Sequence, residues 1–120
     1  PDLQLAHVDY EEAGGDGRMR FTELLDRLAH PTGLLIRRAF EREGFGDPDR
    51  LAVEAPRKLL DYLSKLFEDE RTAKLFLYLT GVALRNRVGV VSEEEWLHAF
   101  ESNDAAYVRG WMEKLDELLR

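Results

Sequence analysis

Glu95 and His98 are the residues best placed for metal chemistry, because they form a Glu-x-x-His pair one helical turn apart. Carboxylate-bridged di-iron bundles use this spacing, but they need two such pairs and two further glutamates from facing helices. The chain holds one pair, and Glu94 with His98 or Asp26 with His30 offers similar spacing. A carboxylate and histidine metal site is therefore our second alternative, and we expect no resident cofactor.

Residues that could support covalent or phosphate chemistry do not occur in suitable patterns. The chain has no cysteine, and its three serines fall on the polar side of a helix (Ser64), at a helix cap (Ser92) and in a turn (Ser102). The glycine-rich stretches GGDG and GFGD are not followed by the Lys and Ser/Thr of a phosphate-binding loop. We expect a non-enzymatic protein.

Our first alternative for the function, a helix-turn-helix transcriptional regulator, depends on residues 92–120. The segments SEEEWLHAF and AAYVRGWMEKLDELL, separated by ESND, resemble in pattern the second and third helices of helix-turn-helix regulators. This resemblance implies base contacts from Tyr107 and Arg109, and Lys114 is a further candidate for nucleic-acid contact. Against this, residues 92–120 contain eight acids and three bases, whereas DNA affinity depends on neutralising phosphates. The turn also lacks the glycine that such motifs often contain.

A basic segment is the main candidate for partner binding. Residues 18–42 hold six arginines and three acids. Arg38 and Arg42 are four residues apart, so they line up on one helix face, and Arg37 lies next to Arg38. We predict that Arg37, Arg38 and Arg42 bind an acidic partner segment, which includes the acidic N-terminal residues of this chain.

Residues 1–17 are predicted to form an extended, acidic, glycine-rich arm. They contain five acids and no base, and apolar residues alternate with polar ones around Leu3, Leu5 and Tyr10. The glycines between residues 13 and 17 interrupt regular structure. The arm could dock on its own bundle, on a twin chain or on a partner, and Leu3, Leu5 and Tyr10 would make the contacts.

The element that must position these residues is a central helix over residues 71–87. Its middle, from Leu75 to Leu84, carries no charge and is apolar on every side of a helical wheel, so it should be buried. Gly81 lies inside this helix and costs about 1 kcal/mol relative to alanine. We expect that it allows close helix packing.

Shorter amphipathic segments surround the central one. Phe21 begins the first, and predicted start signals precede others at Thr32, at Asp47 with Pro48, at Ser92 with Glu95, and at Asn103 or Asp104. The pattern predicts an all-α, single-domain bundle of six to seven helices over residues 18–120, with no sheet.

Bulk properties restrict the setting and the partners. The absence of cysteine favours a cytoplasmic location, and the longest apolar run is about half of the ~20 residues needed to cross a bilayer. A net charge of -7 disfavours nucleic acid and anionic membranes as partners. We therefore predict a small regulatory, adaptor or accessory subunit that acts through protein–protein contacts and forms homo-oligomers.

Overall fold

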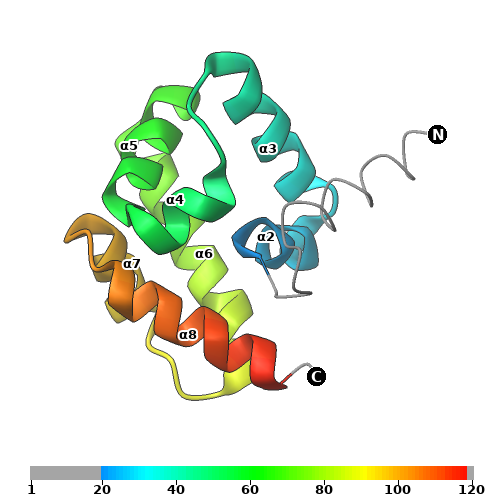
Figure 1. Ribbon diagram of the computed structural model, residues 1–120, viewed down its shortest axis with the longest axis vertical. Helices are drawn as coiled ribbons and strands as arrows, with labels where there is room; N and C mark the ends of the chain where they lie inside the picture. The colour runs from blue at the N-terminus through cyan, green and yellow to red at the C-terminus, as the bar shows by residue number, and fades with distance from the viewer. Residues whose placement is uncertain (1–19, 119–120) are drawn as a thin grey trace.

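A computed structural model describes residues 20–118, and this part of the chain consists of helices joined by short turns and links, with no strand. The predictions for the arm of residues 1–17, including Leu3, Leu5 and Tyr10, lie outside the described residues. Figure 1 shows the arrangement of the helices. They are α2 (Phe21–Ala29), α3 (Thr32–Glu43), α4 (Pro48–Glu54), α5 (Pro56–Phe67), α6 (Glu70–Val88), α7 (Glu93–Glu101) and α8 (Ala105–Leu118). The predicted all-α bundle with a central helix is confirmed.

The central helix is α6, which packs against α2, α5, α7 and α8. Leu77 and Leu84 on its inner face are fully buried. The prediction that the helix is buried on every side is wrong for its outer face, where Leu75 is 58% exposed and Leu79 is 41% exposed. These two leucines lie one turn apart, and no other helix between residues 20 and 118 covers that face sufficiently to bury them. No helix between residues 20 and 118 combines the length and apolar character that a membrane span requires.

Close packing at Gly81 is confirmed. A Cβ atom at this position would lie 2.9 Å from Cδ1 of Trp96 on α7. The Trp96 ring is completely buried, and its Nε1 donates a hydrogen bond to Oγ1 of Thr80 at 2.9 Å. The Thr80 hydroxyl donates in turn to the Leu77 carbonyl oxygen at 2.6 Å. Gly81 therefore lets the Trp96 ring pack closely against α6. In that position the Trp96 Nε1 can donate its hydrogen bond to the Thr80 hydroxyl.

Three of the predicted helix starts are confirmed by side-chain caps. Asp47 accepts a hydrogen bond from the Asp49 N–H at 3.0 Å, and Ser92 accepts one from the Glu95 N–H at 3.3 Å. At the start of α8, Asp104 accepts from the N–H of Tyr107 at 3.1 Å.

Other helix starts receive their caps from a different segment of the chain. The prediction that Thr32 caps α3 is wrong, because Thr32 is the first helical residue and the N–H of Gly33 instead donates to Oδ1 of Asp26 at 2.7 Å. Asn103, with φ of 61°, accepts at 3.1 Å from the N–H of Arg57 at the start of α5. Both caps come from outside the helix that they cap, so they fix the relative positions of the helices as well as their ends.

Candidate functional site

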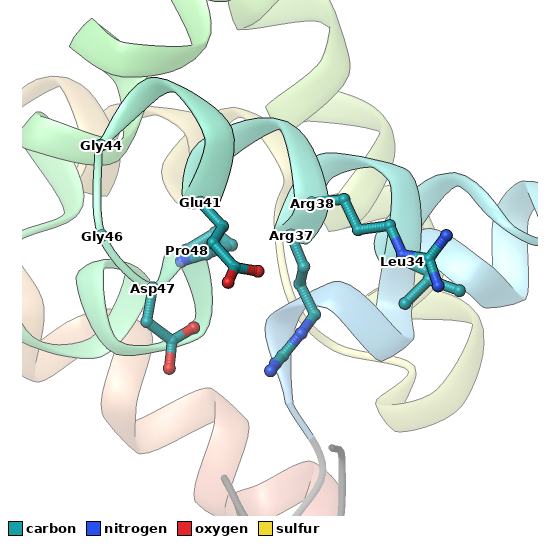
Figure 2. Close-up of a pocket in the computed structure, with 8 residues that line it drawn as sticks. All are labelled: Leu34, Arg37, Arg38, Glu41, Gly44, Gly46, Asp47 and Pro48. Carbon is teal, nitrogen blue, oxygen red and sulfur yellow. The ribbon is translucent and has the colours of Figure 1, made fainter. Parts of the chain in front are cut away.

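A groove lies between α3 and the turn that connects it to α4. It has a volume of about 560 Å³, and Figure 2 shows the residues that line it. They are Leu34, Arg37, Arg38, Glu41, Gly44, Gly46, Asp47 and Pro48. Gly44 adopts a positive φ of 74° as the C-cap of α3, and Gly46 has a φ of 93°. Both glycines let the chain turn sharply, so that Asp47 and Pro48 form the opposite wall.

The two ends of the groove differ in charge. Figure 2 shows the side chains of Glu41, Asp47 and Arg37 pointing toward the same side of the opening, whereas Arg38 extends along α3 beside Leu34. One end therefore combines Arg38 with an apolar side chain. The other end carries two carboxylates beside Arg37, whose charge is paired with Asp49. Such a distribution can orient a bound segment, because opposite charges must meet at each end.

Behind the groove, Arg37 belongs to a buried polar cluster. Its Nη1 donates to Oδ2 of Asp49, and the Arg37 side chain is only 18% exposed. Asp49 also accepts from the Thr22 N–H at 2.7 Å and from the Thr22 hydroxyl at 3.1 Å. Since no side chain caps α2 from its own N-cap residue, Asp49 supplies that function from α4. The cluster joins α2, α3 and α4 and holds the α3 wall of the groove.

Burial raises the pKa of two carboxyl groups in this region. For Asp49, desolvation outweighs the hydrogen bond from the Thr22 N–H and the attraction of Arg37. For Glu23, desolvation outweighs the charge of Arg20, and repulsion from Asp49 acts in the same direction as desolvation. Both carboxylates therefore ionise less readily in the folded chain than in the unfolded chain.

The raised pKa of Glu23 gives a testable pH dependence. Between its unfolded and folded pKa values, the folded state binds more protons, so the contribution of this group to stability is fully present below the unfolded pKa and is lost as pH rises through the folded pKa. We expect the free energy of unfolding of the wild type minus that of Glu23→Gln to fall as the pH rises above about 4, which is the usual pKa of an unfolded glutamate. Urea titrations at several pH values measure this difference in unfolding free energy. A difference that rises with pH would contradict a raised pKa for Glu23.

The three predicted partner-binding arginines do not form one patch. Arg37 is turned toward Asp49, whereas Arg38 is exposed and makes no ion pair with any residue between 20 and 118. Arg42 is exposed and its Nε lies 3.6 Å from Oε2 of the adjacent Glu43. Leu35, which is 57% exposed, shares an outer face of α3 with Arg38 and Arg42 at spacings of three and seven residues. Arg38 and Arg42 thus remain available on the surface, next to an exposed leucine.

The predicted helical hairpin of α7 and α8 is present, but the three residues assigned to nucleic-acid contact are not brought together. Tyr107 and Lys114 lie on one flank of α8, beside a hollow of about 290 Å³. Arg109 is two residues from Tyr107, which puts it on the other flank of the helix. The Tyr107 hydroxyl lies 3.4 Å from Oε2 of Glu95, a carboxylate that would repel phosphate. The geometry adds no support for DNA binding.

Glu95 and His98 have separate neighbours. Glu95 contacts Tyr107, and Nδ1 of His98 lies 4.0 Å from Oε1 of Glu101. Among residues 20–118, no group of three or more histidine, cysteine, aspartate or glutamate side chains is arranged to hold a metal ion. The metal alternative therefore gains no support from the described part of the chain.

The sequence predicted Arg37 as a surface residue but did not identify its buried partners, Asp49 and Thr22. Asp49 occurs in the first turn of a short helix, where an acidic residue is common, so local sequence gives no sign of its contact with α2. No protein-family model matches the chain, and neither the curated proteins nor the solved structures include a significant match.

Proposed function

We propose that this chain is a non-enzymatic interaction subunit that binds an acidic segment of a protein partner along α3 and its groove. The supporting observation is the groove of about 560 Å³, which has a basic and apolar end at Arg38 and Leu34 and an acidic end at Glu41 and Asp47. A segment with a carboxylate and an apolar side chain fits the first end. A basic residue further along that segment would pair with the second end.

The outer face of α3 extends this binding surface. Arg38 and Arg42 offer exposed guanidinium groups, which bind carboxylates through paired hydrogen bonds. Leu35 supplies an apolar contact beside them. Because the buried cluster of Arg37 and Asp49 holds α3 against α2 and α4, little ordering is needed when a partner binds. Regulatory or adaptor action and a cytoplasmic location are parts of this proposal.

Site-specific photocrosslinking in the source cells tests the proposal. A photoreactive amino acid at Leu35 should form a defined adduct with one partner, and Arg38→Glu should reduce that adduct at least about tenfold, since the change replaces attraction by repulsion. Leu75 is a matched control position, because it is 58% exposed whereas Leu35 is 57% exposed. Equal adducts from both positions, or an adduct at Leu35 that persists in Arg38→Glu, would contradict the proposal.

A further inference from the structure

The outer face of α8 is distinct from the α3 groove and has its own hollow. The hollow has a volume of about 290 Å³ and is lined by Ala106, Tyr107, Gly110, Trp111 and Lys114. The rings of Tyr107 and Trp111 lie 6.5 Å apart and are both partly buried. Figure 1 shows α8 well separated from α3, the helix that forms one wall of the groove.

The fold itself does not explain the glycine in the floor of this hollow. Gly110 is inside a helix, where glycine is less favourable than alanine by about 1 kcal/mol. A Cβ at Gly110 would meet no atom within 4 Å, in contrast to Gly81, where the Trp96 ring is close. Packing within the described residues therefore does not require a glycine here, whereas the approach of another molecule would.

The charges on this face alternate in sign and are self-complementary. Arg109 and Glu113 lie on one flank of α8, and Tyr107 and Lys114 lie on the other, next to the hollow. In an antiparallel pair of α8 helices related by a two-fold axis, each flank meets the same flank of the other copy. With the axis between residues 110 and 111, Lys114 of one copy is level with Tyr107 of the other, and Glu113 is within one residue of Arg109.

We propose that two copies of this chain associate through an antiparallel pair of α8 helices. The Trp111 ring of each copy would lie over Gly110 of the other, where the absence of a side chain leaves room for it. Lys114 would lie over the facing Tyr107 ring, and Glu113 would pair with the facing Arg109. The described ion pairs and hydrogen bonds include neither Arg109 nor Glu113, so both are available. A helix face whose charges alternate in sign suits a second copy better than a polyanion.

Sedimentation analysis of the full chain from about 10 µM to about 1 mM tests this association. We expect a monomer–dimer equilibrium, and a moderate affinity, because one helix face is smaller than the ~800 Å² per partner that stable complexes usually bury. Arg109→Glu or Glu113→Arg alone should weaken the dimer at least about tenfold, since symmetry creates two like-charge contacts. The double variant Arg109→Glu, Glu113→Arg should restore the dimer. Such a restoration is not expected if the two side chains only stabilise the monomer.

Gly110→Gln separates association from folding. A Cβ at this position meets no atom within 4 Å in the monomer, and glutamine favours helix more than glycine does. The melting temperature should therefore stay the same or rise while the dimer is lost. Arg42→Glu on α3 is the control and should leave the dimer unchanged while it alters the proposed partner surface. A wild type that stays monomeric at every concentration, a Gly110→Gln protein that still dimerises, or a charge swap that does not restore association would each overturn the proposal.

Discussion

Gly33→Ala should destabilise the fold by about 3 kcal/mol or more, although it adds a single methyl group. A Cβ at Gly33 would lie 1.9 Å from the Thr22 carbonyl oxygen and 2.8 Å from its carbonyl carbon. These atoms are backbone, so no side-chain rotation can relieve the overlap, and α2 and α3 would have to separate. Urea unfolding followed by circular dichroism measures the loss of stability.

The separation of α2 from α3 would also weaken a second contact. Thr22 is the residue that donates both its N–H and its hydroxyl to Asp49, so a shift of its backbone disturbs the polar cluster behind the groove. Alanine keeps the N–H that Gly33 donates to Asp26, and the experiment therefore isolates the effect of the added carbon. A variant as stable as the wild type would show that the two helices do not approach as closely as described.

Gly110→Ala provides the matched control for Gly33→Ala. The same atom is added within a helix, but at Gly110 it meets nothing within 4 Å. Measured at a dilution where the chain is monomeric, this substitution should stabilise the fold by up to about 1 kcal/mol through helix propensity. The same substitution is thus expected to change the stability in opposite directions. Packing dominates the effect at Gly33, whereas helix propensity dominates it at Gly110.

Sequence pattern predicted the helices well, because their apolar spacing and their start signals are local properties. The start of α7 follows from Ser92 and Glu95, which lie within one turn of each other. A glycine inside an apolar helix predicted close packing at Gly81, but it did not identify the Trp96 ring of α7 as the neighbour. By contrast, the cap that Asp49 supplies to α2 joins residues that are 27 positions apart. The pattern of either segment alone contains no information on such a pairing, and neither does it show that Arg37 turns inward.

Exposure was also harder to predict than helix position. The apolar residues of α6 suggested burial on every side, yet Leu75 and Leu79 face outward. A helical wheel records which residues share a face, but only the placement of the neighbouring helices determines which face is covered. The candidate groove could not be predicted for the same reason, because its shape depends on how the turn after Gly44 lies beside α3.

Asp49→Ala should cost about 3–5 kcal/mol, which is the usual effect of removing one member of a buried ion pair. The change removes the carboxylate that pairs with Arg37 and the acceptor for the first-turn N–H of α2. Because this carboxylate holds α3 against α2 and α4, binding at the α3 groove should weaken as well. Chemical denaturation gives the loss of stability, and the photocrosslink at Leu35 reports the effect on the groove.

Arg50→Ala is the control, because Arg50 is adjacent to Asp49 in sequence and also forms an ion pair. Its Nε lies 3.0 Å from Oε2 of Glu54, and the two side chains are 74% and 59% exposed. Surface pairs of this kind contribute about 0–1 kcal/mol, so this variant should be nearly as stable as the wild type. The contrast between the two substitutions measures what burial adds to a charged contact. Equal effects would mean that the desolvation that raises the Asp49 pKa cancels the benefit of the pairing.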